Sequence, residues 1–406
     1  MDRAILLFIA VIIGSCSSNS NFDHPWNEIL NSDSEVFNRV IDSLDHYEVQ
    51  ILYTRIDNED GLIRLTSHPL HIDNNRYYYP ASTVKMPTAF LAIEYLNELS
   101  SAHQLDINRY TRIKYDSIAP PQTPEVIDSS SSTGYPNVAH YIEKIFSVSD
   151  NNAYNRLYEL MGQDYINERM KEKGIFKNSK IIHRVGVSGF DEESSRYTNP
   201  YQLINEHGVV IFNQNELYAL YQDYPVTADV KKGVGRYDDD LDSVIYEPFD
   251  FTYKNYLSIT ELQQSLIRVI YPELFDSTEQ YNINEEQLGF LRSTMKKTPD
   301  QYAHLKDNSD YYDSYVKFFM YGDSQDEIPD HIEISNKVGW AYGYLTDNAH
   351  IRDTEQNIEF FLTATIHVNR NQIYNDGVYE YDSIGMPFLA ELGRQVYNYE
   401  LVRTGN

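Results

Sequence analysis

The chain has few cysteines, few tryptophans and few cations for its length. Its 406 residues include one Cys and two Trp, and 33 Lys and Arg stand against 61 Asp and Glu. A single cysteine excludes an intrachain disulfide. The net charge of −28 is spread along the sequence. It argues against a nucleic acid as partner, because phosphates are held by clustered cations.

Long hydrophobic runs are also missing. The apolar run of residues 4–13 has ten residues, which is too short to span a bilayer, and it is typical of a signal peptide over residues 1–15. The sequence Ile-Gly-Ser before Cys16 resembles the bacterial lipobox, in which cleavage leaves a lipidated cysteine. We therefore expect a lipid anchor on Cys16, a flexible tether over residues 16–31, and a location in the bacterial envelope, facing the periplasm or the exterior. Secretion with a free Cys16 is the alternative.

What the chain does contain is enough apolar material for a substantial core. Hydrophobic residues make up 41% of the sequence and aromatic residues 14%, with 36 tyrosines. We expect most tyrosines to be half-buried in packing and some to line clefts and interfaces. The composition is that of a folded protein with one large domain or two ordinary ones.

Segments with the character of strands occur near both ends of the chain, and helical patterns fill the middle. Strands are expected over residues 48–53, 62–66, 332–338, 349–352 and 358–368, and helices over residues 36–44 and 385–399. The sequence Asn58-Glu59-Asp60-Gly61 predicts a hairpin between the first two strands. The fold class predicted is α+β, an antiparallel sheet flanked by helices plus an all-helical lobe, in a single domain over residues 32–406.

The stretch Tyr79-Pro80-Ala81-Ser82-Thr83-Val84-Lys85-Met86-Pro87 places a hydroxyl and an amine in one short segment. The apolar spacing that follows predicts an amphipathic helix over about residues 82–99. Helical positions three apart have Cβ atoms roughly 5–6 Å from each other, so we expect Lys85 to hydrogen-bond Ser82. The amine would act as a base only if its pKa falls from about 10.4 through burial or a neighbouring cation.

Ser-x-x-Lys alone decides nothing, because it occurs three times, at 82–85, 293–296 and 314–317. A second motif, Ser149-Asp150-Asn151, lies between two helical runs and is equally typical of a capping turn. A third, Lys337-Val338-Gly339, ends a predicted strand, where the glycine lets a ligand approach the backbone closely. The similar Lys231-Lys232-Gly233 has no preceding strand.

In this order the three motifs match the signature of the penicillin-recognising serine hydrolases. The sequence resembles the class A β-lactamases and their relatives over most of residues 36–399. The resemblance implies a β-lactamase/transpeptidase-like fold and a serine hydrolase that forms an acyl-enzyme, without cofactor or metal. The implied substrate is a β-lactam or a related small-molecule or peptide amide or ester.

The resemblance also implies a role for each motif residue, since acyl transfer needs a nucleophile, a base, a proton shuttle and an oxyanion hole. The catalytic residues would be the nucleophile Ser82, its base or relay Lys85, and the proton shuttle Ser149. Lys337 would be the fourth, holding the substrate carboxylate and lowering the pKa of Lys85. The substrate-binding residues would be Asn151, which contacts the substrate amide, together with Gly339 and Trp340, where the Trp340 N–H joins that of Ser82 in the oxyanion hole.

Two departures from the family pattern change the expected activity. Val338 replaces a residue that usually carries a hydroxyl, which removes one donor from the carboxylate site. The Glu-x-x-Leu-Asn element that activates the deacylating water is missing, and residues 183–188 occupy its region. Asp191, Glu192 and Glu193 follow, and we expect them to be solvated surface. We therefore predict slow deacylation.

Residues 201–256 are predicted to be an insertion near the mouth of the site, either a lid or a surface loop. Two other functions remain open: a D,D-peptidase-like peptidoglycan enzyme, and a non-catalytic binding protein on the same fold. We expect a monomer whose only membrane contact is the lipid on Cys16.

Overall fold

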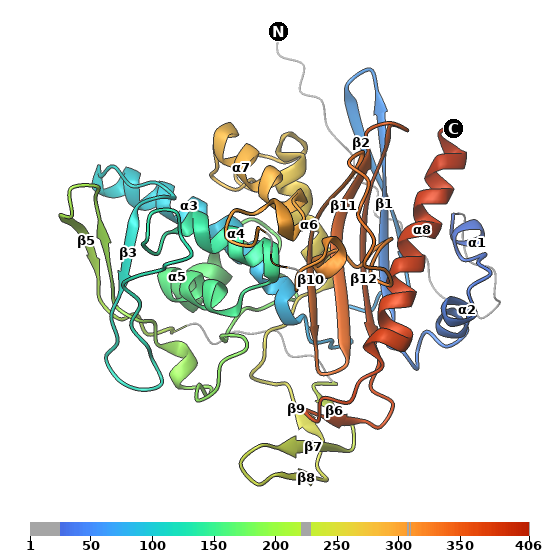
Figure 1. Cartoon of the computed structure of the whole chain (residues 1–406), viewed down its shortest axis with the longest axis horizontal. Helices are drawn as coiled ribbons and strands as arrows, with labels where there is room; N and C mark the ends of the chain where they lie inside the picture. Colours follow the sequence, from blue (N-terminus) through green and yellow to red (C-terminus); the bar gives the residue numbers. More distant parts are fainter. Residues whose placement is uncertain (1–24, 221–228, 307, 309, 406) are drawn as a thin grey trace.

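The computed structural model describes residues 25–220, 229–306, 308 and 310–405 (Figure 1). The expected signal peptide and Cys16 lie outside these residues. The largest sheet has five strands in the order β10-β11-β12-β1-β2, all antiparallel. Its strands are β1 (Gln50–Glu59), β2 (Leu62–Leu70), β10 (Ile332–Ala341), β11 (Tyr344–Asp353) and β12 (Ile358–His367).

The sheet joins the two ends of the chain through the pairing of β1 with β12, for example Leu52 opposite Thr363. The hairpin between β1 and β2 turns at Asp60 and Gly61, with φ of 54° and 85°, the left-handed values that a two-residue turn of this kind requires. The predicted strands and the predicted α+β fold class are therefore confirmed, although most strands are longer than the sequence indicated.

Three helices cover the outer face of this sheet (Figure 1). They are α8 (Met386–Arg403), α1 (Trp26–Ile29) and α2 (Glu35–Ile41). Trp26 and Ile29 are buried, and the Trp26 ring lies edge-on to Tyr53 of β1, with 6.3 Å between centroids. The predicted tether is therefore wrong for its last residues, 25–31, because these apolar side chains gain more from packing under α8 than from solvent exposure.

The other face carries the helical lobe. Its helices are α3 (Lys85–His103), α4 (Val138–Val148), α5 (Asn151–Glu172), α6 (Ile259–Ile270) and α7 (Glu285–Lys296). The prediction of an amphipathic helix is wrong for the first three turns of α3, where every residue from Lys85 to Leu96 is buried. Helices α4, α5 and α6 surround it, so its polar residues need partners inside the protein.

Three smaller sheets lie beside the lobe and below it in Figure 1. The first contains β3 (Arg112–Tyr115), β4 (Tyr201–Ile204) and β5 (Val210–Gln214). The second contains β7 (Gly235–Asp238), β8 (Ser243–Ile245) and β13 (Ile373–Tyr374). The third pairs β6 (Lys231–Lys232) with β9 (Phe249–Asp250). Residues 201–214 thus belong to a sheet with β3, and residues 231–250 form the lower sheets with β13. That residues 201–256 are an insertion stays a prediction.

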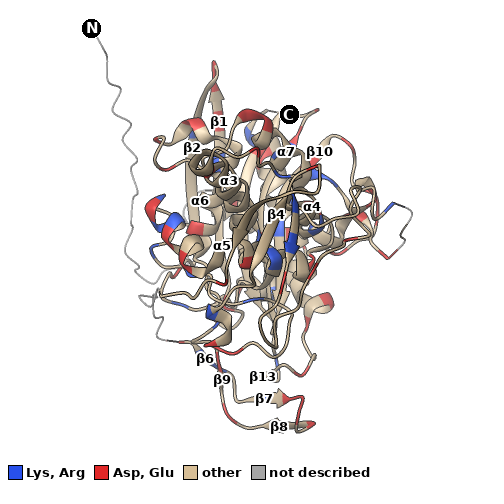
Figure 2. Ribbon diagram, turned by 90° about the vertical axis from the view of Figure 1, so that its left-hand side faces the viewer, with Lys and Arg blue, Asp and Glu red and all other residues tan. Residues whose placement is uncertain are grey.

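Acidic residues lie on many elements and loops of the face drawn in Figure 2, with basic residues between them. This agrees with a negative charge that is spread along the chain rather than gathered in one segment. Within the described ranges, no helix combines the length and the apolar character that crossing a membrane requires.

Candidate active site

Ser82 lies in a 3₁₀ turn, η1 (Ala81–Val84), that leads directly into α3. The preceding residue, Ala81, has a φ of 45°, which is unfavourable for a residue with a Cβ. Strand β10 presses against this turn: a Cβ on Gly339 would come within 2.6 Å of Pro80 O and 2.8 Å of Ser82 N. Glycine at position 339 is therefore required for the approach of the first and third motifs.

Lys85 is fully buried, and its amine is held by the second motif. Its Nζ donates to the main-chain oxygen of Ser149, to Ser149 Oγ at 3.3 Å and to Asn151 Oδ1 at 2.6 Å. The expected hydrogen bond to Ser82 is not among those formed by the described residues. Because Ser82 lies in the 3₁₀ turn, the α-helical spacing assumed from the sequence does not apply.

The Ser149-Asp150-Asn151 turn joins α4 to α5, as predicted. Ser149 ends α4 in the left-handed region with a φ of 58°, and Asp150 caps α5 by accepting a hydrogen bond from Ala153 N at 2.7 Å. The turn therefore both caps a helix and presents Ser149 and Asn151 to Lys85, so the two interpretations of this motif hold together.

Lys337 completes the cluster from β10. Its Nζ donates to Ser149 Oγ at 2.7 Å and to Val338 O at 2.8 Å, and the residue is 2% exposed. Two amines from distant parts of the chain therefore meet at one serine hydroxyl. A hydroxyl can accept two hydrogen bonds and keeps its own proton to donate, so Ser149 is suited to relay protons.

Burial lowers the pKa of Lys85 to about 7, and the Asp150 carboxylate opposes this shift. Burial also holds the pKa of Lys337 well below its usual value, with the neighbouring Lys85 cation as the second cause. Lys85 thus lowers the pKa of Lys337, whereas the predicted effect of Lys337 on the pKa of Lys85 is not among the causes of the Lys85 shift. Burial is the reason that Lys85 can be neutral near pH 7.

Side chains alternate along β10, so Lys337 and Val338 face opposite sides of the sheet. Val338 is fully buried in the core that includes Phe388 and Leu392 of α8. Trp340 packs edge-on to Tyr315, with 6.2 Å between ring centroids. The missing hydroxyl at position 338 is therefore explained by packing, and this side chain is not part of the polar site.

Residues 183–188 lie against the second motif. A Cβ on Gly186, whose φ is 59°, would overlap the amide of Asn151, and Asn155 holds Val185 through both backbone groups, at 2.9 and 3.0 Å. Next to this segment, Glu159 is buried and forms ion pairs with Arg156 and Arg184, at 2.7 and 2.9 Å. Each oxygen of the Glu159 carboxylate therefore accepts a hydrogen bond from a guanidinium group.

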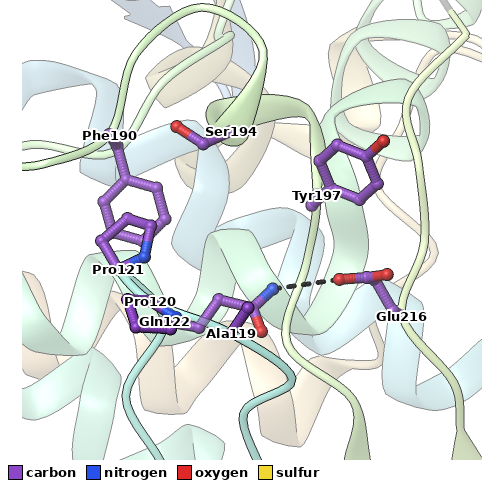
Figure 3. A pocket seen from close by; sticks show the side chains of 8 residues that line it. All are labelled: Ala119, Pro120, Pro121, Gln122, Phe190, Ser194, Tyr197 and Glu216. Atoms are coloured by element: carbon purple, nitrogen blue, oxygen red, sulfur yellow. Dashed lines mark hydrogen bonds between the residues drawn. The ribbon is translucent and has the colours of Figure 1, made fainter.

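The acidic residues that follow this segment are exposed, as expected for solvated surface. Asp191 accepts hydrogen bonds from the backbone and hydroxyl of Ser194, which lower the pKa of its carboxyl group. This loop also borders a pocket between residues 119–122, Tyr197 and Glu216, in which Gln122 Nε2 donates to Glu216 Oε1 at 3.3 Å (Figure 3). None of the predicted site residues lines that pocket.

The expected insertion contacts the edge of the site through aromatic rings. Tyr79, three residues before Ser82, packs against Phe251 and Tyr342, with 5.7 and 5.2 Å between centroids. Phe249 of β9 also packs against Tyr342, at 5.0 Å. Residues 249–251 therefore form part of the wall beside the serine turn.

A second buried lysine cluster, which the sequence motifs did not predict, lies beside β10. Lys317 is 1% exposed and donates to Met295 O, Ile334 O and Asn336 Oδ1 at 2.7 to 2.8 Å. Asn336 in turn donates to Asp347 at 2.8 Å. Ser314-x-x-Lys317 was a visible signal, but no pattern in the sequence pointed to its partners.

The comparisons with known proteins agree with the sequence motifs. Residues 35–210 match the profile of the beta-lactamase enzyme family, Beta-lactamase2. The chain resembles the β-lactamase-like serine hydrolases. No match is found among curated proteins.

Solved structures similar to this chain include a beta-lactamase from Sphaerobacter thermophilus DSM 20745, which is 14% identical with a TM-score of 0.47, over 94% of this chain and 97% of its own. The structure of PBP-A is 13% identical with a TM-score of 0.48, over 90% and 96%. A beta-lactamase from Burkholderia ambifaria is 10% identical with a TM-score of 0.46, over 90% and 98%.

Proposed function

We propose that the protein is a serine hydrolase of the β-lactamase or penicillin-binding type that forms an acyl-enzyme on Ser82. The observation that carries the proposal is the meeting of the Lys85 and Lys337 amines at Ser149 Oγ, beside the Ser82 turn that contacts Gly339. A nucleophile, a base of lowered pKa and a proton relay are the groups that acyl transfer needs.

In the proposed mechanism, Ser82 Oγ attacks the carbonyl carbon of an amide or ester while its proton passes to neutral Lys85. The N–H groups of Ser82 and Trp340 stabilise the oxyanion. Ser149, held by Lys337, then delivers a proton to the leaving nitrogen of an amide or the leaving oxygen of an ester, and the C–N or C–O bond breaks. Asn151 positions the substrate amide, and water later hydrolyses the ester on Ser82.

Hydrolysis of that ester is proposed to be the slow step. Glu159 is committed to two arginines, and Asp191 is fixed by Ser194 at an exposed turn. General-base assistance is typically worth about 10²–10⁴-fold, so its absence would let the acyl-enzyme accumulate. The same observation favours a D,D-peptidase-like reaction on peptides over efficient β-lactam hydrolysis. We also propose that the protein lies in the bacterial cell envelope, where a lipid on Cys16 anchors it.

A fluorescent penicillin tests this function. One adduct per chain is expected by intact mass, mapped to Ser82 and still present after the free drug is removed. Ser82→Ala should abolish it, and Ser293→Ala, at an exposed serine of another Ser-x-x-Lys match, should not. A folded protein with no adduct from a penicillin or a fluorophosphonate would be a binding protein. Rapid turnover without an adduct would refute slow deacylation.

A further inference from the structure

A cluster of two histidines and a glutamate lies on α4, outside the residues of the proposed mechanism. His140 and Glu143 are one helical turn apart on α4, and His304 follows α7. One ring nitrogen of each histidine and a carboxylate oxygen of Glu143 all lie within 4.8 Å of one another. The histidines are far apart in the sequence, so their meeting could not be predicted from it.

We propose that His140, Glu143 and His304 bind a divalent transition metal ion, with Zn²⁺ as the best match. Two imidazoles and one carboxylate form a donor set that zinc uses in three-ligand sites, with water in the fourth position. Tetrahedral coordination at about 2.0–2.1 Å separates ligand atoms by about 3.3–3.5 Å. His140 Nδ1 and Glu143 Oε2 are already 3.5 Å apart, and the whole set lies within 4.8 Å, so small side-chain shifts would complete the coordination.

One nitrogen of each imidazole has a hydroxyl partner, as metal-binding histidines require of the nitrogen that does not bind the metal. His140 Nε2 contacts Ser130 Oγ at 2.8 Å, with an oxygen of Asp128 at 3.7 Å, and His304 Nε2 contacts Ser147 Oγ at 3.2 Å. Such partners fix the tautomer and leave the other nitrogen to face the metal. For His140 that other nitrogen is Nδ1, the atom that faces Glu143.

Charge and access also fit a cation site. Glu143 and Asp128 supply two carboxylates. Among the described residues, Lys144 is the one lysine or arginine that pairs with either of them, and it contacts Asp128 at 3.5 Å. His140 is 5% exposed, whereas the Glu143 side chain is 35% exposed, so an ion reaches the cluster from solvent.

The consequence of binding would be a link between two parts of the lobe. The ion would join the segment after α7 to α4, whose C-terminus carries Ser149. Ser147, the partner of His304, is two residues before Ser149. We therefore infer that the metal stabilises the packing behind the second motif.

Zinc binding tests the site directly. Untagged protein treated with a chelator is titrated with Zn²⁺ alone and monitored by calorimetry and thermal unfolding, and Co²⁺ reports the geometry through its visible spectrum. We expect one Zn²⁺ per chain and an unfolding temperature that rises with the zinc concentration. Glu143→Gln and His304→Asn should each weaken binding by at least about 10-fold, and Ser147→Ala by about 10-fold.

His207→Ala is the control, because this histidine is exposed and far in the sequence from the cluster. Its binding should equal that of the unchanged protein. If Zn²⁺ does not bind stoichiometrically, or if Glu143→Gln and His304→Asn bind it as tightly as the unchanged protein does, the proposal is wrong. Glu143→Gln keeps the shape of the side chain, so the test does not depend on whether His304→Asn folds.

Discussion

Two clusters of buried lysines meet β10 at the neighbouring residues Asn336 and Lys337 but differ in how their charge is balanced. Lys317 has three oxygen acceptors of its own, and the buried Asp347 lies beyond Asn336. Lys85 and Lys337 instead share the hydroxyl of Ser149. Burial lowers the pKa of both Lys85 and Lys317 to about 7, so a lowered pKa does not by itself distinguish them.

The difference teaches that the partners of a buried amine, rather than its burial, indicate what it does. Asp347 has its own pKa raised to about 6 by burial and receives hydrogen bonds from the backbone of Phe318 and Phe319. The Lys317 cluster is thus closed and suited to stability. The Lys85 cluster ends on a hydroxyl next to a partly exposed serine turn, which suits proton transfer.

Lys85→Met should have the largest effect on acylation. Without the base, the rate of adduct formation on Ser82 should fall by about 10²–10⁴-fold. The free energy of unfolding should fall by less than in Lys317→Met, because Asn151 is exposed and water can replace the donor that its side chain loses. Stopped-flow labelling and urea unfolding measure the two quantities.

Lys296→Met is the matched control, since Lys296 ends another Ser-x-x-Lys match and pairs with Glu333 at the surface. Its acylation rate should be unchanged. If Lys85→Met were to unfold the protein and leave residual acylation untouched, the roles assigned to the two clusters would be reversed.

Lys317→Met should give the opposite result. It leaves three buried acceptors and Asp347 without their cation, which typically costs about 3–5 kcal/mol of unfolding free energy. Urea unfolding measures this loss. The double variant with Asp347→Asn should recover part of it, because the uncompensated carboxylate is also removed. Full stability in the single variant would show that Lys317 is neutral and dispensable.

Lys337→Ala should slow acylation less and change its pH dependence. Neutral Lys85 is the base, so the rate should rise with pH through about 7 in the unchanged protein. Removing a nearby cation favours the charged form of Lys85, raises its pKa and moves this rise to higher pH. Loss of one charge-assisted hydrogen bond to Ser149 should cost about 10-fold in rate.

Lys231→Ala, in the other Lys-x-Gly sequence, provides the control for this variant. Lys231 is exposed and pairs with Asp250 at 3.6 Å. A pH profile that moves equally in both variants would reflect overall charge. An unchanged rate and profile in Lys337→Ala would remove the third motif from the site.

The sequence predicted the parts of this protein that are encoded locally. Alternating apolar residues located the strands, Asp60-Gly61 located the hairpin, and the three motifs located the residues that meet at Ser149. The Lys317 cluster could not be predicted, because its partners come from other elements.

The two predictions about the Ser82 region that proved wrong also depended on contacts between elements distant in the sequence. Helix α3 was predicted to be amphipathic because its apolar spacing fits one buried face, yet all of its residues from Lys85 to Leu96 are buried, with three helices around them. The predicted hydrogen bond between Lys85 and Ser82 is also absent from those that the described residues form. The amine instead meets acceptors from Ser149, at the end of α4, and Asn151, at the start of α5, which lie far from Lys85 in the sequence.

Ala81→Gly should have the smallest effect and tests whether the serine turn is strained. An alanine at a φ of 45° costs about 1–2 kcal/mol relative to its favoured conformations, which glycine avoids. Glycine also gives the unfolded chain more freedom, worth about 0.4–1 kcal/mol, and removes a buried methyl worth about 0.8 kcal/mol. These contributions nearly cancel, so the unfolding free energy should change by less than about 1 kcal/mol.

Ala89→Gly is the comparison that makes this result informative. Ala89 is also buried, but it lies inside α3, where glycine costs about 1 kcal/mol and the lost methyl adds to that cost. Urea unfolding should therefore show a loss of about 2 kcal/mol for Ala89→Gly and almost none for Ala81→Gly. Equal losses would mean that the turn before Ser82 is unstrained. A smaller loss at Ala81 would show that the strain is held in place by the packing of β10 against the turn.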